Sequence, residues 1–137
     1  MTEPLNHHEA LIYVMVASSG IDHTMIHDEF ARIGEIVSNL PLFADCDENE
    51  LIKAAEACSE ILSADDGLQQ VLRLVREALP EKLRETAYWV ALEVAAADRL
   101  VRPEELRFLE MLGDALELNR TTTAAFERGI RARNTTL

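Results

Sequence analysis

The sequence predicts an all-α fold, a single domain of seven helices with two pseudo-symmetric helix-turn-helix halves. Three observations support this prediction. Apolar residues recur at helical spacing along most of the chain. Aromatic residues make up only 5% of the 137 residues and there are five glycines, a composition typical of helices packed through aliphatic side chains. One pattern of helix, acidic turn and helix also occurs twice in the chain, which suggests two related halves.

The first predicted helix covers about residues 6–18, with Asn6 as its N-cap, and Ser18-Ser19-Gly20 ends it. The second covers about residues 25–39, where apolar residues at helical spacing form a buried face, and Pro41 stops it. The Leu42-Phe43 pair that follows is expected to contact the core.

The third helix is predicted to begin at residues 45–47, where Asp47 and Glu50 resemble a capping box. A turn at Asp65-Asp66-Gly67 separates it from a fourth helix over about residues 68–79. Pro80 then precedes a fifth helix over residues 81–97. This helix is nearly all apolar in its second half, so it is expected to be buried.

The sixth helix is predicted to run from Pro103 to Leu118, with Pro103 at its first position and Asn119 closing it in the left-handed conformation. Thr121 or Thr122 is then expected to cap a seventh helix that ends near Arg133. Residues 1–137 are predicted to form one domain, with fraying expected at residues 1–9 and 134–137.

The charge balance restricts the partners of this chain. Twenty-five acidic and 13 basic residues give a net charge of −12, which argues against nucleic acid and against an anionic membrane surface. The apolar runs are too short for membrane insertion, and the N-terminus lacks the basic region of a signal peptide. We therefore expect a cytoplasmic protein with cations or basic proteins as partners. Cys46 and Cys58 are expected to be reduced thiols in helices.

The repeated segment places acidic residues at matching positions. At a constant offset along the chain, Tyr13 corresponds to Trp89, Asp22 to Asp98, Asp28 to Glu104 and Glu29 to Glu105. If the two halves pack together, these carboxylates could converge on a divalent cation, with Mg²⁺ or Ca²⁺ favoured because both prefer oxygen ligands. The alternative is that each aspartate ends a helix and each glutamate complements the dipole of the next.

Two further candidates lie near these turns. His23 and His27 have a spacing that can hold Zn²⁺ on a helix, although two surface histidines are the simpler interpretation. Glu93 is a lone carboxylate in an apolar helix; it either lines the same site as Asp98 or lies at the edge of the apolar stripe, and the edge is favoured. The sequence contains no GxSxG motif and no glycine-rich phosphate loop.

The doubled motif resembles the tellurite-resistance TerB family. The resemblance rests on Ala95-Ala96-Ala97-Asp98 with Pro103-Glu104-Glu105-Leu106, and on the matching pattern from Asp22 to Glu29. It covers about residues 11–118 and implies a seven-helix domain, an acidic site for a divalent metal and a role in tellurite resistance and related stress responses. Carried onto this sequence, the metal ligands would be Asp22, Glu29, Asp98 and Glu105. From their places in the sequence, we expect Asp28, Glu93, Glu104, His23 and His27 to surround these ligands. His23 and Arg99 follow the aspartates where the family commonly has glycine.

Three hypotheses follow from these observations. The first is a non-catalytic module that binds a divalent cation, Zn²⁺ being less favoured than Mg²⁺ or Ca²⁺, and docks a partner protein. The second is a purely structural or interaction domain without metal, with a homodimer through an apolar helix face as one form. The third and least favoured is a metal-assisted hydrolase with His23 or His27 as the base.

Overall fold

A computed structural model of the chain describes residues 4–19, 27–97 and 103–137, except for the side chains of residues 27–30, 97 and 104. Over these residues the chain forms seven α-helices, two short 3-10 helices and no strand, which confirms the all-α prediction. The elements are α1 (His7–Ser18), α2 (His27–Asn39), η1 (Pro41–Phe43), α3 (Glu48–Leu62), α4 (Gly67–Ala78), η2 (Glu81–Leu83), α5 (Arg84–Ala97), α6 (Pro103–Ala115) and α7 (Arg120–Asn134). Among the described helices, none is long and apolar enough to cross a membrane.

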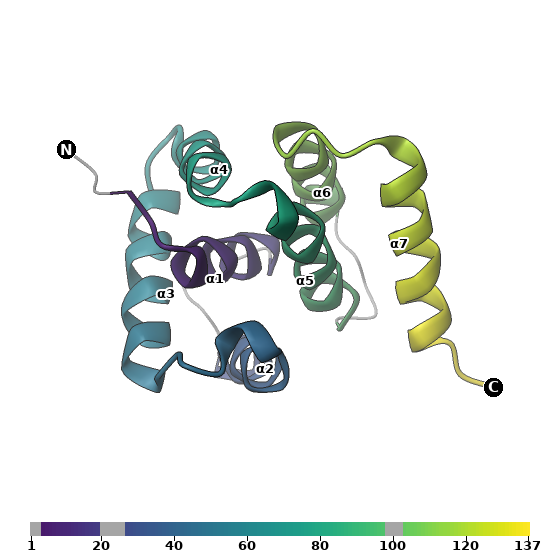
Figure 1. Cartoon of the computed structure of the whole chain (residues 1–137), viewed down its shortest axis with the longest axis horizontal. Helices are drawn as coiled ribbons and strands as arrows, with labels where there is room; N and C mark the ends of the chain where they lie inside the picture. The colour runs from purple at the N-terminus through teal and green to yellow at the C-terminus, as the bar shows by residue number, and fades with distance from the viewer. Residues whose placement is uncertain (1–3, 20–26, 98–102) are drawn as a thin grey trace.

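Helix α1 lies at the centre of the fold, with α3, α4 and α5 packed against it (Figure 1). Its residues from Ala10 to Val16 are all buried, as expected for a helix that is apolar on every face. A capping box begins the helix: the Asn6 side chain accepts from the Glu9 N–H at 2.8 Å, and the Asn6 N–H donates to the Glu9 carboxylate at 3.0 Å. These bonds satisfy backbone donors that the start of the helix would otherwise leave without protein partners.

The helices that follow the two acidic segments match in length and position. Helices α2 and α6 each have 13 residues, and they begin at equivalent positions of the sequence repeat, His27 and Pro103. The equivalent core positions Ile33 and Leu109 are both buried. These bounds agree with a duplicated helix pair, while the pseudo-symmetric arrangement of the halves stays a prediction.

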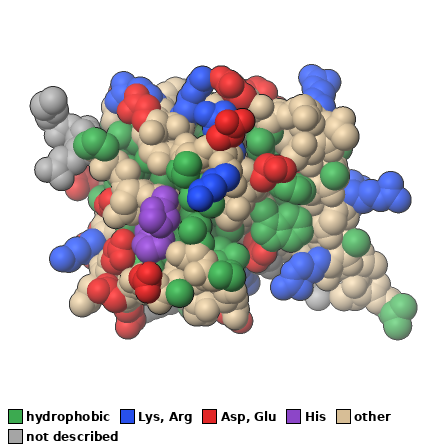
Figure 2. Space-filling view, in the orientation of Figure 1, with side chains coloured by type: hydrophobic (Ala, Val, Ile, Leu, Met, Phe, Trp, Pro, Cys, Tyr) green, Lys and Arg blue, Asp and Glu red, His purple; other side chains and the backbone are tan. Residues whose placement is uncertain are grey.

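Helix α7 forms an outer layer against α5 (Figure 1). Phe126 of α7 packs edge-on against Trp89 of α5, with ring centroids 5.8 Å apart. The Tyr88 hydroxyl of α5 also donates to the Glu127 carboxylate of α7 at 3.0 Å. Figure 2 shows Lys and Arg side chains on the right of the molecule, where α7 lies.

The connection between α6 and α7 corrects two predictions. Glu117, not Asn119, adopts the left-handed conformation, with φ of 58°. The N–H groups of Glu117 and Leu118 donate to the carbonyls of Asp114 and Gly113, which is the pattern of a Schellman cap. Asn119 instead caps α7 by accepting from the Thr122 N–H at 2.8 Å, so neither threonine is the cap and α6 ends earlier than predicted, at Ala115.

Two other local predictions need correction. Cys46 lies in the segment before α3 and not in a helix, whereas Cys58 is helical and buried as expected. Residues 81–83 were predicted as the first turn of the fifth helix. They form a separate 3-10 turn, and α5 begins at Arg84. The Asp47 cap of α3 is confirmed, since its side chain accepts from the Glu50 N–H at 2.7 Å.

Candidate functional site

Most of the predicted metal ligands fall outside the described part of the chain. Asp22, His23 and Asp98 lie in the segments that the structure does not describe. The backbone positions of His27, Asp28, Glu29 and Glu104 lie in α2 and α6, but their side chains are also outside the described set. The convergence of the two acidic turns therefore stays a prediction.

The helices that flank the two acidic segments belong to one packed group. Helices α1 and α2 flank residues 20–26, and α5 and α6 flank residues 98–102. Both α1 and α2 contact α5, and α1 also contacts α6. The two segments thus connect elements that share a core, a precondition for any site formed between them.

Glu105 is the one proposed ligand whose side chain is described, and it is only 4% exposed. It lies in the first turn of α6, on the same face as the buried residues Phe108, Leu109 and Leu112. A buried carboxylate is costly unless it is paired or coordinated. Its burial therefore distinguishes Glu105 from a solvated glutamate in the first turn of a helix, which the helix dipole alone would stabilise.

Glu93 has a different environment from Glu105. It is half-buried on α5 and accepts a hydrogen bond from the Trp89 indole N–H at 2.5 Å. It also lines a polar pocket between α2, α5 and α7, together with Arg32, Glu35 and Arg133. This position fits the edge of the apolar stripe; whether Glu93 also faces Asp98 lies outside the described residues.

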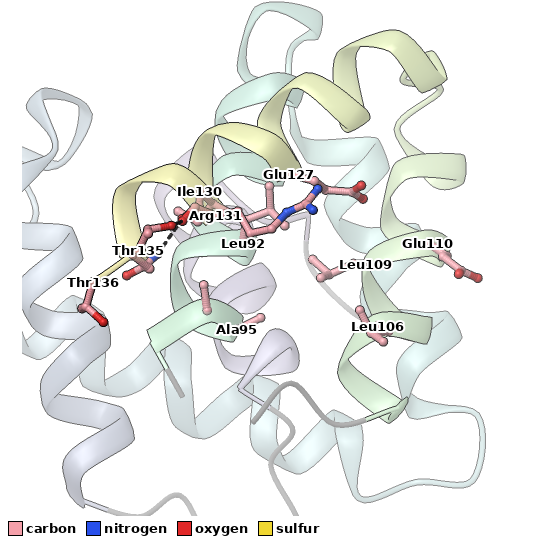
Figure 3. A pocket seen from close by; sticks show the side chains of 12 residues that line it. Leu92, Ala95, Leu106, Leu109, Glu110, Glu127, Ile130, Arg131, Thr135 and Thr136 are labelled. Carbon is pink, nitrogen blue, oxygen red and sulfur yellow. Dashed lines mark hydrogen bonds between the residues drawn. The ribbon is translucent and has the colours of Figure 1, made fainter. Parts of the chain in front are cut away.

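A groove of about 650 Å³ runs between α5, α6 and α7 (Figure 3). Its apolar lining comes from Leu92, Ala95, Ala96, Leu106, Leu109 and Ile130, and charged side chains at its margin are Glu110, Glu127 and Arg131. Leu106 is 52% exposed, which is unusual for a large apolar side chain in this molecule. The groove can therefore hold an apolar or amphipathic ligand.

A second cluster joins the start of α1 to the start of α3. His8 Nδ1 lies 3.4 Å from Glu50 Oε1, and the His8 Nε2 atom is 2.8 Å from the Leu42 carbonyl oxygen. The ligand atoms of His8, Cys46 and Glu50 all lie within 4.8 Å of one another. Figure 2 shows histidine side chains with acidic side chains beside them over the start of α1. The fold thus brings a nitrogen, a sulfur and an oxygen donor together, although His8 is far in sequence from Cys46 and Glu50.

Local structure fixes two of the three members of this cluster, His8 and Glu50. The capping box places His8 in the first turn of α1, where its ring stacks on Phe43 with centroids 5.1 Å apart. The Asp47 cap fixes the first turn of α3 and hence Glu50. Burial, together with the neighbouring carboxylates of Glu50 and Asp47, raises the pKa of the Cys46 thiol from 9.0 to about 11.

Sequence reasoning missed this cluster. The predicted helix over residues 6–18 places His8 in its first turn, which is correct, but nothing in the sequence reveals its burial against η1. The spacing of Cys46 and Glu50 was a weak signal, because residues four apart share a helix face only when both are helical. The third ligand, His8, belongs to a helix that is distant in sequence, and only the fold brings it close to the other two.

Comparison with known proteins identifies a family. The family model described as tellurite resistance protein TerB matches residues 8–128. No curated protein matches the chain at a significant level, and no solved structure does so either.

Proposed function

This chain belongs to the tellurite resistance protein TerB family, and from that premise we propose that it is a non-catalytic module that binds a divalent cation and docks a partner protein. The cation would bind where the two acidic turns meet, and the partner in the groove between α5, α6 and α7. Membership of the family makes this chain a tellurite-resistance-like module. Binding of a cation and docking of a partner protein are what we propose.

The observation that carries the proposal is the repeated carboxylate pair, one member of which is buried. Asp22 and Asp98 are followed at equal spacing by Glu29 and Glu105, and the described member, Glu105, is 4% exposed. Four carboxylates in one site repel one another unless protons or a cation neutralise them. Oxygen ligands of this kind suit Mg²⁺ or Ca²⁺, and the net charge of −12 raises the local concentration of either ion.

The remaining candidates would surround this site and not ligate the ion. We assign this supporting position to Asp28, Glu93, Glu104, His23 and His27. Among them Glu93 accepts a hydrogen bond from the Trp89 indole N–H, which occupies one of its carboxylate oxygens. Carboxylates around the site would attract the cation and help to orient the side chains that bind it.

Helix α6 connects the two parts of the proposal. Glu105 faces the core, and its neighbour Leu106 lines the groove and is 52% exposed. A cation held by Glu105 would fix the first turn of α6 and with it the wall of the groove. The charged margin, with Glu110, Glu127 and Arg131, would suit an amphipathic segment of a partner protein.

Calorimetry with Mg²⁺ and Ca²⁺ tests the cation. We expect saturable heat from the full chain and its loss in the double variant Asp98→Asn with Glu105→Gln. The control is Asp114→Asn, which removes an exposed carboxylate from the same helix α6. Equal binding by the double variant and the control, or no binding by the unmodified chain, would favour the alternative of a metal-free structural or interaction domain.

The assignment as non-catalytic has its own test. A metal-assisted hydrolase would need a base such as His23 or His27 near the ion. We expect no metal-dependent turnover of phosphate or carboxylate esters by the full chain. Turnover that depends on Mg²⁺ or Mn²⁺ and disappears in His27→Ala would replace the binding module with the hydrolase.

A further inference from the structure

We propose that His8, Cys46 and Glu50 form a second metal site, which takes a thiophilic divalent cation of the Zn²⁺ class. This site is separate from the acidic turns in sequence and in ligand chemistry, so it goes beyond the function proposed above. It rests on the geometry of three described side chains at the junction of α1, η1 and α3.

The spacing of the donor atoms fits a tetrahedral ion. With metal bonds of about 2.0–2.3 Å, neighbouring ligand atoms of a tetrahedral Zn²⁺ lie about 3.4–3.6 Å apart. The observed separation of His8 Nδ1 and Glu50 Oε1 is 3.4 Å. The Cys46 sulfur lies within 4.8 Å of both, so it needs to move on the order of 1 Å to reach bonding distance. Cys46 precedes α3 and is not held in a helix, which allows this movement.

The hydrogen bond on the far side of the His8 ring supports the same conclusion. The Leu42 carbonyl can only accept, so the His8 Nε2 atom at 2.8 Å carries the proton and donates it. In the neutral ring the lone pair then resides on Nδ1, directed toward Glu50. A lone pair and a carboxylate oxygen at this distance repel each other unless a proton or a cation lies between them. A backbone carbonyl that holds one nitrogen is also the usual support of a metal-binding histidine.

The site is both organised and reachable. The side chain of His8 is 11% exposed and that of Glu50 is 31% exposed, so one side of the cluster opens to solvent. The ring of His8 is fixed by its stack on Phe43, which reduces the entropy lost on binding. Three protein ligands leave the fourth position of a tetrahedral ion for water or an external ligand.

The mixed donor set decides between classes of cation. A sulfur and an imidazole nitrogen favour Zn²⁺ over Mg²⁺ or Ca²⁺, which take oxygen ligands. The acidic turns contain no sulfur, so the two sites differ in the ions they prefer. On binding, the Cys46 thiol loses its proton to solvent and its sulfur forms the bond to the metal.

Titration of the full chain with Co²⁺, a spectroscopic substitute for Zn²⁺, tests the site. We expect a thiolate-to-cobalt charge-transfer band that saturates at one equivalent and disappears when Zn²⁺ is added. Cys46→Ser should abolish the band. The matched control Cys58→Ser should retain it, because Cys58 is fully buried and donates to the Tyr13 carbonyl.

A second variant tests the histidine. His8→Gln retains a donor for the Leu42 carbonyl but removes the ring nitrogen, and we expect Co²⁺ binding to weaken by at least about tenfold. Circular dichroism of each metal-free variant would show that the fold is unchanged. Absence of the band in the unmodified chain, or its survival in Cys46→Ser, would overturn the site and identify the His8–Glu50 contact as an ordinary ion pair. Neither result would affect Mg²⁺ or Ca²⁺ binding at the acidic turns, so the two proposals fail separately.

Discussion

Glu105 and Leu106 are neighbours on α6 but have opposite environments: Glu105 is 4% exposed and Leu106 is 52% exposed. This is the reverse of what their chemistry favours, since a carboxylate prefers water and a leucine prefers the core. Two such inversions occur at adjacent residues in the first turn after the acidic segment, which supports the proposal that this turn takes part in binding.

The exposed leucine gives the first prediction. Leu106→Lys should reduce binding of the neutral apolar dye Nile red to the groove between α5, α6 and α7, because it places a charge on the apolar lining. It should change the free energy of unfolding by no more than about 0.5 kcal/mol, since the side chain is half exposed. Dye fluorescence and urea unfolding measure the two effects.

Two controls make this prediction specific. Leu137→Lys makes the same charge change at an exposed position outside the groove lining and should leave dye binding unchanged. Leu112→Ala removes a fully buried side chain from the same helix and should cost about 2–5 kcal/mol of stability. Equal dye binding by Leu106→Lys and the unmodified chain would show that the groove is not the apolar site.

A pair of glycines gives the second prediction. A Cβ atom at Gly67 would lie 2.2 Å from the Ile61 carbonyl oxygen, whereas one at Gly129 would come no closer than 3.7 Å to the Trp89 ring. Gly67→Ala must therefore displace backbone at the start of α4 and should destabilise the protein by about 1–3 kcal/mol. Gly129→Ala removes a glycine from the interior of α7 and should stabilise it by up to about 1 kcal/mol.

Thermal unfolding followed by the fluorescence of Trp89, the single tryptophan, measures both changes. Both substitutions add one methyl group. Opposite signs of the change in unfolding free energy would therefore reflect the different space beside the two glycines. A Gly67→Ala variant as stable as the unmodified chain would contradict the close approach of α4 to the end of α3, and destabilisation by Gly129→Ala would contradict the space beside Trp89.

The buried thiol and phenol groups give the third prediction. Burial raises the pKa of Cys58 from 9.0 to about 12 and that of Tyr13 from 10.0 to about 12, and burial together with the bond to Glu127 also raises the pKa of Tyr88. The unfolded chain therefore loses these protons at lower pH than the folded chain. Below about pH 9 these groups give a constant contribution to stability. As the pH rises from there to about 12, that contribution is lost.

Urea unfolding at successive pH values measures this loss. We expect the free energy of unfolding to fall steadily through the alkaline range. In a double variant with Cys46→Ser and Cys58→Ala the fall should begin about one pH unit later, because the remaining groups, Tyr13 and Tyr88, start from the higher pKa of tyrosine. A free energy of unfolding that stays level up to pH 12 would show that these side chains are accessible to solvent in the folded protein.

The helices could be predicted from the sequence because each has local signals. Asn6 and Asp47 are side-chain caps that act within one turn, and both have this role in the structure. The end of α6 could not be predicted in this way. Glu117 has a left-handed backbone that its side chain does not favour, and its carboxylate pairs with Arg76 of α4 and with Arg84, contacts that the local sequence does not reveal.

The sites were less predictable than the fold. The sequence left two roles open for Glu105, a cation ligand or a partner for the helix dipole, and it did not predict that the side chain is buried. The His8 cluster depends on contact between α1, η1 and α3, which are separated by all of α2. Periodicity and spacing describe one helix at a time and do not reveal such contacts.

The most direct test of the central claim is the location of a paramagnetic cation. Substoichiometric Mn²⁺ added to the ¹⁵N-labelled chain broadens the amide signals nearest to the bound ion. We predict selective loss of the signals around Asp22, Glu29, Asp98 and Glu105 in the same titration, because one ion would contact both turns. Loss around one turn alone, or uniform weak broadening across the acidic surface, would contradict a shared cation site.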